Sequence, residues 1–286
     1  MKKILIIGAT GMLGKPVTRE LVKAGFDVTI LARDVRKAET EFSGCTILRG
    51  DLRDPGSLEA ACAGKDAVYL SLHVPQDAVP EGWHAEREGL ENLIGAAKKA
   101  GIGCIAYLSS LVKDYQGMNG FSWWMFDLKH GAVRMLRESG IPYLIFYPSN
   151  FMENLVNGFR RENRLTAVGS SDVKKYWIAG SDYGKQVGRA LEQFTESREY
   201  VIQGPEGYTD EEAIGVFIRH YNKAPLTAGK VPLGLLKFLG LFSRKMDYGA
   251  RILEALNNYP EEFRAAQTWT DLGRPEVSIE EFARRS

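Results

Sequence analysis

The seven residues that follow the first apolar run constrain this chain more than any other feature of its sequence. Ile4–Ile7 are four consecutive large apolar residues, and a glycine-rich segment comes directly after them. A glycine turn between a buried strand and a helix leaves free main-chain N–H groups at the helix N-terminus, where a phosphate can bind. Gly8 allows the tight turn, Gly11 lets the backbone approach a pyrophosphate, and Gly14 lets the helix pack closely on the strand. The predicted diphosphate cradle consists of Gly8, Thr10, Gly11, Met12, Leu13 and Gly14.

Short apolar runs alternate with helix-period segments through the first half of the chain. We expect strands at Ile4–Ile7, Asp27–Leu31, Cys45–Arg49, Ala67–Leu72, Cys104–Ser109 and Tyr143–Tyr147. Between them we expect helices at Leu13–Ala24, Arg36–Glu41, Pro55–Cys62, His84–Ala100 and Trp123–Ser139. Strands that are apolar on both faces and alternate with amphipathic helices are typical of a parallel sheet covered on both sides. The predicted fold class is therefore α/β, a doubly wound parallel sheet of the Rossmann type that binds its ligand at the carboxyl ends of the strands.

The regular alternation ends after Pro148. We expect helices over Phe151–Val168 and Tyr208–Tyr221, one further strand over Arg198–Gln203, and mostly helical structure from 224 to 286. The predicted organisation is a dinucleotide-binding core over residues 1–204, interrupted by a cap-forming segment near 150–178. A small, mostly helical region over residues 205–286 would complete the substrate cap. A length of 286 residues accommodates one large domain with such an appendage.

Composition excludes several classes of partner. Lys and Arg number 37 against 36 Asp and Glu, so there is no electrostatic case for nucleic acid. The three cysteines lie far apart, with no CxxC pair and no His at ligand spacing. This pattern predicts reduced thiols, a cytoplasmic location and no metal site.

Two apolar segments could be taken for a signal peptide or a membrane-spanning helix. The basic start Lys2-Lys3 precedes an apolar run, but that run stops at Gly8, so it is better explained by a strand than by a signal peptide. Val231–Phe242 is about a dozen residues long, where a bilayer span needs about 20. We expect it to pack on the body or to form a lid over a pocket, with a membrane-surface helix as the alternative. No membrane partner is therefore predicted.

The residues after the second expected strand distinguish two cofactors. An NAD site has Asp or Glu at the end of this strand, where the carboxylate accepts hydrogen bonds from the ribose 2′-OH. Here the strand is followed by Arg33, with Arg36 and Lys37 close behind. A guanidinium at this position can pair with a 2′-phosphate through two hydrogen bonds. We therefore predict that NADP(H) is preferred and that Arg33 binds its phosphate, while Asp34 keeps NAD(H) possible.

Several segments together resemble the extended and atypical short-chain dehydrogenase/reductases. These are Gly8–Gly14, Gly50–Asp54 with Ser57-Leu58, Gly64–Val68, Glu88–Ile94 with Ala97–Gly101, and Tyr107–Ser110. Three more resemble the NmrA-like branch of that family, namely Ser139–Tyr143, Pro148–Asn154 and Gly204–Glu206. The resemblance covers about residues 1–220, and nothing beyond Ala224 is diagnostic.

The resemblance implies a dinucleotide lying across the strand ends. It places Asp51 near the adenine, and Leu72 and His73 near the ribose and nicotinamide. Ser109 would end the fifth strand beside the cofactor, and the nicotinamide would be flanked by Pro148, Asn150 and Phe151. Asp51 has an alternative role as the cap of a turn, and His73 has one as a surface histidine.

Catalysis is where the chain departs from the family pattern. Catalytic relatives carry Tyr and Lys four residues apart on one helix, so that the lysine holds the ribose and lowers the pKa of the phenol that donates a proton. Lys129 lies on the expected helix, but Met125 stands four residues before it. Trp123 and Trp124 supply no acid, and Tyr115 lies in the preceding loop. The standard tyrosine-dependent mechanism is therefore absent.

Lys129 admits two functional interpretations. In the first, Lys129 or a water that it orders supports hydride transfer, and desolvation lowers its pKa enough for it to act as the acid. The substrate would be a small apolar carbonyl or quinone-like acceptor under an aromatic wall of Phe121, Trp123, Trp124 and Phe151. This resembles isoflavone-reductase-like and quinone-reducing relatives, which keep the lysine without the tyrosine. In the second, Lys129 only anchors the ribose, and the protein is a non-catalytic dinucleotide sensor, as NmrA-like regulators are.

An NADPH-dependent oxidoreductase, monomeric or homodimeric, is the function we favour from the sequence. The alternative is a regulator that binds a protein partner, and nucleotide-sugar epimerases or dehydratases are a third class that normally needs the missing tyrosine. An enzyme requires a closed, mainly apolar pocket beside the nicotinamide. A regulator would instead expose an apolar patch, for which Val231–Phe242 is the candidate.

Overall fold

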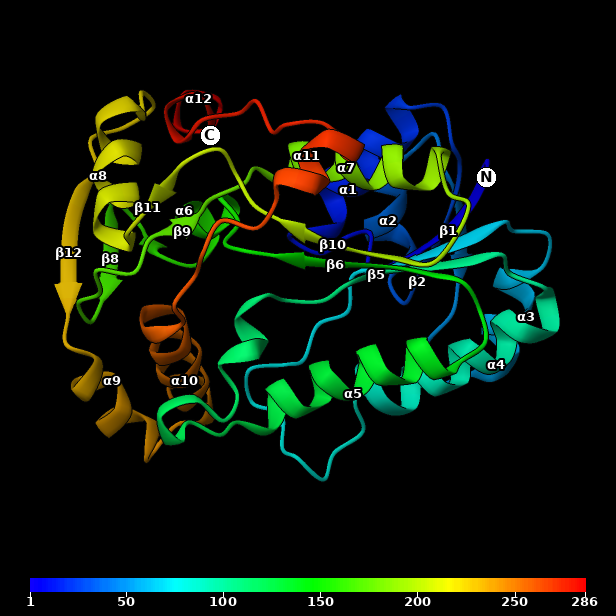
Figure 1. The fold of residues 1–286 in the computed structure, drawn as a ribbon, viewed down its shortest axis with the longest axis horizontal. Helices are drawn as coiled ribbons and strands as arrows, with labels where there is room; N and C mark the ends of the chain where they lie inside the picture. The colour runs from blue at the N-terminus through cyan, green and yellow to red at the C-terminus, as the bar shows by residue number, and fades with distance from the viewer.

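One parallel sheet of seven strands organises the molecule, which is described over residues 1–286 by a computed structural model (Figure 1). The strands lie in the order β10-β6-β5-β4-β1-β2-β3, and all neighbours are parallel. Their bounds are β1 Lys3–Ile7, β2 Asp27–Ala32, β3 Thr46–Arg49, β4 Ala67–Leu70, β5 Cys104–Leu108, β6 Tyr143–Pro148 and β10 Arg198–Ile202. Every residue of β4 and β5 is buried, which is why their sequences are unbroken apolar runs.

Helices cover both faces of this sheet (Figure 1). One face carries α3 Pro55–Cys62, α4 Leu90–Ala100 and α5 Trp124–Glu138. The other face carries α1 Gly14–Lys23, α2 Val35–Glu41, α7 Gly180–Glu192 and α11 Ala266–Leu272. The two layers bury separate hydrophobic cores of 34 and 26 residues. The predicted doubly wound α/β fold is confirmed.

The order of the strands reverses at β1. β2 and β3 follow on one side of β1, and the chain then crosses back to place β4 on the other side. Ligands of doubly wound sheets bind in the crevice at such a reversal, outside the carboxyl ends of the strands. The glycine turn leaves the carboxyl end of β1 and Ser71–His73 leave that of β4, so these two segments border the crevice.

The remaining segments form a second region, named the cap here, beyond the carboxyl ends of β6 and β10 (Figure 1). The cap has its own core of 14 buried residues, contributed mainly by α6, β8, α8 and α12. Its elements are α6 Glu153–Asn157, β7 Arg160–Arg161, β8 Arg164–Val168, β9 Lys175–Tyr176, β11 Gly207–Tyr208, α8 Asp210–His220, β12 Thr227–Val231, α9 Leu233–Gly240, α10 Arg244–Asn258 and α12 Ile279–Arg285.

Two predictions for the cap are wrong. The helix expected over Phe151–Val168 is only the short α6, after which β7 and β8 form an antiparallel hairpin with Glu162 at φ 51° in its turn. Leu165 and Ala167 are buried alternately along β8, and this period of two is the strand signal that the helix interpretation overlooked. β12 pairs in parallel with β8, where only helix was expected from residue 224 onward.

α7 was not predicted, and its glycines explain why. Gly180, Gly184 and Gly188 recur every four residues, which lowers helix propensity along the sequence. In the structure this glycine face packs against α1, where a Cβ added at Gly184 would lie 3.0 Å from Cβ of Glu20. The glycines therefore allow two helices to approach closely rather than interrupt one.

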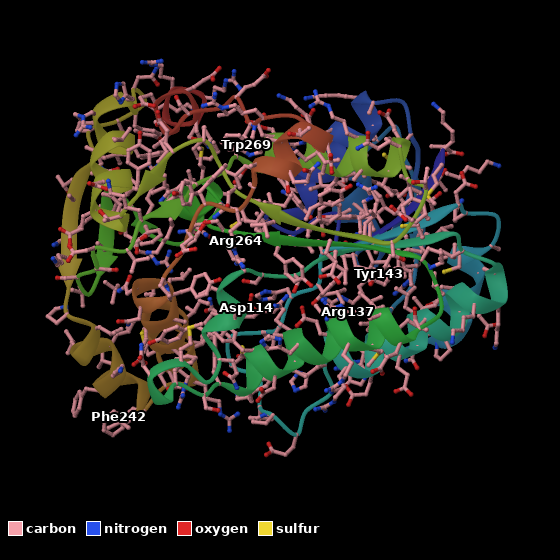
Figure 2. The ribbon with its side chains drawn as sticks, in the orientation of Figure 1. Asp114, Arg137, Tyr143, Phe242, Arg264 and Trp269 are labelled. Carbon is pink, nitrogen blue, oxygen red and sulfur yellow. The ribbon has the colours of Figure 1, made fainter.

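The end of the chain does not all belong to the cap. α11 lies against the core, where Leu272 is fully buried. Trp269, at the position labelled in Figure 2, donates its indole N–H to the carbonyl of Gln203 at 3.1 Å. Thr268 donates to the carbonyl of Val201 at 2.9 Å. These bonds fasten α11 along the edge strand β10, whereas the sequence led us to expect cap structure throughout 205–286.

Candidate active site

The glycine turn has the geometry of a cradle that only glycine can build. Gly8 has φ 92°, and a Cβ there would lie 2.1 Å from the carbonyl oxygen of Ser71. A Cβ at Gly14 would lie 2.0 Å from the carbonyl oxygen of Gly8. At Gly11 a Cβ would meet only the Gly8 oxygen, at 3.2 Å, so its other side is open to a ligand.

The N-terminus of α1 has no anion of its own. Leu13 occupies the cap position without a side-chain hydrogen bond, and the first turn contains no acidic residue. The side chain of Met12 is exposed. Helix N-termini with unpartnered N–H groups attract anions. The turn therefore fits the diphosphate of a dinucleotide.

The segment after β4 lies directly against this turn. The amide of Ser71 donates to the carbonyl of Ile7 at 3.0 Å. Leu72 is half-buried, and His73 is exposed. Partial burial of the imidazole lowers the pKa of His73, the charge of Lys129 lowers it further, and Glu86 opposes both effects. The charges of Lys129 and Glu86 therefore act on this segment.

Arg33 and Asp34 have different surroundings at the end of β2. The Asp34 carboxylate caps α2 by accepting the amide N–H of Lys37 at 3.1 Å. Arg33 is exposed and forms no ion pair. The Asp34 carboxylate, which allowed NAD(H) as an alternative cofactor, is therefore engaged with its own helix. The Arg33 guanidinium beside it is free.

Asp51 has the local role that was its alternative explanation. Its carboxylate accepts the amide N–H of Arg53 at 2.9 Å, and its own amide donates to Ser57 Oγ at 3.2 Å. α3 then starts from a separate cap, Asp54. Asp51 lies at the end of β3, and its place beside the adenine stays a prediction.

Lys129 on α5 belongs to a buried cluster that the sequence did not reveal. Its Nζ forms an ion pair with Glu86 Oε1, and Nζ lies 5.6 Å from the ring centroid of Tyr107. Tyr107 donates its hydroxyl to the same Glu86 oxygen at 3.1 Å. Tyr107 and Glu86 are buried, whereas the lysine side chain keeps 20% of its surface exposed. Lys129 is thus a paired ammonium at the edge of the cluster, and not the isolated desolvated amine that the sequence analysis considered.

Burial shapes the chemistry of this cluster. The Glu86 carboxylate is 1% exposed, and its Oε2 has no hydrogen-bond partner. Burial and the adjacent Glu86 charge raise the pKa of Tyr107 well above its ordinary value. Burial and Glu86 also raise the pKa of Tyr248 on α10. Both phenols therefore stay protonated, and Tyr107 acts as a donor to Glu86.

Glu86 lies in a π-helical turn, η1 Ala85–Gly89, that opens α4. Insertions of this kind are frequent at functional sites. The spacing of Glu86 to the buried residues of α4 is the sequence signal that was missed. Glu86, Leu90, Leu93 and Ala97 recur at intervals of four, three and four residues, which places the carboxylate on the core-facing side of the helix.

The residues near Lys129 that could have replaced the missing tyrosine are core residues. Met125 is buried, and Tyr115 packs on Phe121 with ring centroids 5.0 Å apart. Phe121 and Trp123 belong to the core on the α5 face of the sheet, and Trp124 packs against it.

The predicted aromatic wall does not form as one surface. Phe151 belongs to the opposite core, where its ring packs on Tyr183 at 5.4 Å. It therefore cannot share a wall with the aromatic residues of α5. The reason is that Phe151 follows β6, where the chain crosses to the other face of the sheet.

Two buried polar atoms lie at the ends of β5 and β6 without a partner. Ser109 Oγ accepts and donates nothing, although its amide donates to Phe146 at 2.9 Å. Asn150 Nδ2 is unpartnered, while its Oδ1 accepts from Asn154 at 2.7 Å. Buried polar groups are nearly always satisfied, so these atoms fit a site that receives a polar ligand. Pro148 ends β6 two residues before Asn150.

Two clefts of the surface lie away from this corner. One of about 290 Å³ is bounded by α7 and residues 272–276, and one of about 340 Å³ lies beside α8. Charged side chains are prominent in the lining of both, and neither includes Lys129 or the glycine turn. Neither has the apolar walls expected of a substrate pocket.

The fold and this corner define a class of protein. A doubly wound sheet presents unpartnered main-chain amides at its strand reversal, and Lys129 of α5 lies over Tyr107, which pairs with the last residue of β4. This is the architecture of dinucleotide-binding Rossmann proteins. A family model described as the NmrA-like family matches residues 1–282, so the chain belongs to that family, as its motifs indicated.

Its relatives include both reductases and an assembly factor. Photosystem II assembly factor Ycf39 of Trieres chinensis is 27% identical over 260 residues, covering 88% of this chain and 79% of that protein. NAD(P)H azoreductase of Xenophilus azovorans is 28% identical over 213 residues, covering 73% and 70%. The crystal structure of an NADPH-dependent quinone oxidoreductase from Escherichia coli, complexed with NADPH, has a TM-score of 0.74 at 23% identity and covers 99% of both chains. That structural likeness shows the shared fold.

Proposed function

We propose that this protein is an NADPH-dependent oxidoreductase that transfers hydride to a small apolar carbonyl or quinone-like acceptor. The observation that carries the proposal is the ion pair of Lys129 with buried Glu86 beside Tyr107, near the carboxyl end of β5. Burying a carboxylate beside a lysine has a desolvation cost, and buried ionisable clusters of this kind concentrate at functional sites. The names of the azoreductase and quinone oxidoreductase relatives support the same class of reaction.

The residues present fit the dinucleotide. The glycine turn would hold the diphosphate with its main-chain amides, and Arg33 would pair with the 2′-phosphate because Asp34 is engaged in capping α2. Ser109 and Asn150 would supply their unpartnered polar atoms to the ligand. When bound, NADPH supplies the hydride.

Lys129 performs the proton chemistry in this proposal. Its ammonium has three N–H donors, and Glu86 takes one of them, which leaves two for the ribose and for the acceptor oxygen. As negative charge develops on that oxygen, a donor from Lys129 stabilises it and delivers the proton. The exposed part of the side chain lets the amine regain a proton from water. Glu86 and Tyr107 act through Lys129 as positioning residues.

The test is turnover of a quinone and carbonyl panel with NADPH, comparing Lys129→Met with Lys98→Met. Lys98 is an exposed lysine of α4 that forms no ion pair, so it controls for loss of one charge. We expect kcat to fall by about a hundredfold or more in Lys129→Met and to stay unchanged in the control. Equal turnover in both variants would remove Lys129 from catalysis.

Cofactor preference is tested by fluorescence titration with NADPH and NADH. Arg33→Ala should reduce the preference for NADPH by about tenfold to a hundredfold, the range of one lost charge-assisted contact. Arg36→Ala, one turn away on an exposed face, should leave it unchanged. If NADPH binds but no acceptor is reduced, the protein is a non-catalytic dinucleotide sensor and not an enzyme.

A further inference from the structure

We infer that α9 and its turn into α10 bind the surface of a membrane that contains anionic lipid. Six of the ten large apolar side chains that the chain exposes gather here, and we name them the α9 tip. They are Leu235, Phe238, Leu239, Leu241, Phe242 and Met246. An exposed cluster of this kind marks an interaction site, and it is the exposed apolar patch that the regulator alternative predicted for Val231–Phe242.

The α9 tip projects from the molecule. No residue of α9 is buried, and the helix rests against α10, with Leu236 3.6 Å from the Cβ position of Gly249. Leu241 and Phe242 are 77% and 78% exposed, and Figure 2 places Phe242 at the outer corner of the cap. The rings of Phe238 and Phe242 lie 5.6 Å apart. Such a protruding apolar corner suits shallow insertion, because lipid requires no matching surface.

The charge around the tip is positive. No acidic residue occurs between Lys223 and Met246, whereas Lys230, Lys237, Arg244 and Lys245 all lie there. Lys230 and Lys237 are paired with Glu211 and Glu254 at 2.6 and 2.7 Å.

Arg244 and Lys245, the two cations next to Phe242, are free to contact anionic lipid. Arg244 is exposed and forms no ion pair, and Lys245 has only Asp77 at 4.0 Å. Basic residues beside exposed apolar side chains are the pattern of segments that lie in the interface of anionic membranes.

The geometry disfavours three other roles for the α9 tip: a membrane span, a dimer interface and a lid. No helix of the structure is long and apolar enough to cross a bilayer, and α9 has only eight residues, so the contact is interfacial. A second copy related by a twofold axis through this patch would bring the unpaired cations of both copies into one interface. A lid over the crevice would need the tip to face inward, but it is Tyr248 of α10 that packs on Trp123, at 5.2 Å. This inference reverses our sequence-based expectation of no membrane partner.

The experiment is flotation of the full chain with vesicles of phosphatidylcholine alone and of equimolar phosphatidylcholine and phosphatidylglycerol. We expect at least about tenfold tighter binding to the anionic vesicles, weakening as salt is raised. Leu241→Ser/Phe242→Ser should lose at least about tenfold of this binding, and Arg244→Glu/Lys245→Glu should lose the dependence on phosphatidylglycerol. Phe242→Trp should show a blue-shifted emission when anionic vesicles are added, because the new indole enters an apolar environment.

Matched controls separate the tip from general effects. Val22→Ser removes another exposed apolar side chain, on α1, and Lys2→Glu/Lys98→Glu makes the same charge change at exposed positions far from the cap. Both should bind vesicles like the wild type. Absence of vesicle binding overturns the inference, and so does a dimer that Leu241→Ser/Phe242→Ser converts to monomer. A raised KM for apolar acceptors in that variant, with no vesicle binding in the wild type, would make the tip a lid.

Discussion

Glu86 decides what Lys129 can do at the scale of single residues. An isolated amine in an apolar corner loses its charge easily, whereas a carboxylate in contact favours the ammonium. Glu86 is itself held by the Tyr107 hydroxyl at 3.1 Å, so the pair has a fixed geometry at the end of β5. The lysine therefore acts as a charged donor, with its carboxylate partner on the neighbouring helix rather than on its own.

Glu86→Gln tests this positioning. Glutamine keeps the size and accepts from Tyr107 but removes the counter-charge. We expect kcat to fall about tenfold to a hundredfold while NADPH affinity changes little. Glu91→Gln, an exposed residue of α4, should turn over acceptors like the wild type. An unchanged kcat in Glu86→Gln would make Glu86 a packing residue only.

Elements were predictable where a local pattern determines them. The strand and helix periods identify α1, α4, α5 and five of the first six strands because each buries a continuous face. The edge strand β3 was predicted as well, although none of its residues is buried. The glycine turn was predictable for the same reason, since a positive φ and close backbone approach require glycine. α7 and β12 depend on partners far away in the sequence, namely α1 and β8, and no local signal announces such a partner.

In the candidate site too, residues set by a local pattern were predictable, and residues that depend on distant partners were not. Arg33 was placed at the end of β2 by the strand pattern, and His73 was placed after β4 by the family resemblance; their contacts with a cofactor stay predictions. Glu86 was missed because a buried carboxylate becomes meaningful only beside its partner, and that partner lies 43 residues further along the chain. Phe151 was misplaced because the face to which a ring turns after β6 depends on the path of the cap.

Glu153 couples three elements through one buried carboxyl. It begins α6, accepts the amide N–H of Gly180 at the start of α7 at 2.9 Å, and lies beside Pro16 of α1. Burial raises its pKa to about 7; the donated amides oppose this, and the charge of Asp182 adds to it. Between the ordinary value of 4.5 and about 7, the unfolded chain is ionised while the native protein keeps the proton.

Glu153 should therefore contribute stability that is complete below pH 4.5 and is lost as pH rises to about 7, by about 3 kcal/mol. Glu153→Gln keeps an acceptor for Gly180 and carries no charge, so most of this pH dependence should disappear. The measurement is urea unfolding at a series of pH values between 5 and 8. Glu138→Gln, an exposed control on α5, should keep the wild-type slope. A slope that persists in Glu153→Gln would place its origin in another group.

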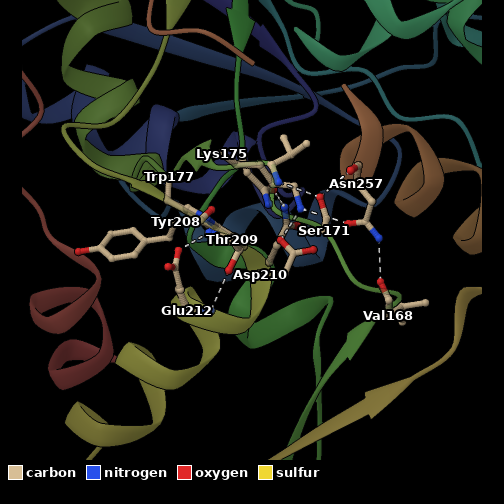
Figure 3. A network of polar contacts seen from close by, with 12 residues as sticks. Val168, Ser171, Lys175, Trp177, Tyr208, Thr209, Asp210, Glu212 and Asn257 are labelled. Atoms are coloured by element: carbon tan, nitrogen blue, oxygen red, sulfur yellow. Dashed lines mark hydrogen bonds and ion pairs between the residues drawn. The ribbon is translucent and has the colours of Figure 1, made fainter. Parts of the chain in front are cut away.

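At the scale of the whole molecule, the chain passes between core and cap repeatedly. It leaves the core after β6, returns for α7 and β10, leaves again for α8 to α10, returns as α11 and ends in the cap as α12. A buried polar network holds the cap elements together (Figure 3). Lys175 of β9 pairs with Asp210 of α8 at 2.6 Å, and Asn257 of α10 donates to the carbonyl of Val168 at 2.8 Å. Lys175 Nζ lies 3.5 Å from Asn257 Oδ1, which joins the two halves of the network.

Lys175→Met tests how far the cap depends on this network. Lys175 and Asp210 are both buried, so removing the cation leaves an uncompensated carboxylate inside the cap. We expect the free energy of unfolding to fall by about 3–5 kcal/mol, measured by urea denaturation. Lys174→Met, at the exposed neighbouring position, should stay near the wild-type value. Lys175→Met/Asp210→Asn should recover much of the loss, because replacing both partners leaves no buried charge. If the double variant is no more stable than Lys175→Met, packing of the lysine stem rather than its charge holds α8 against α10 and β9.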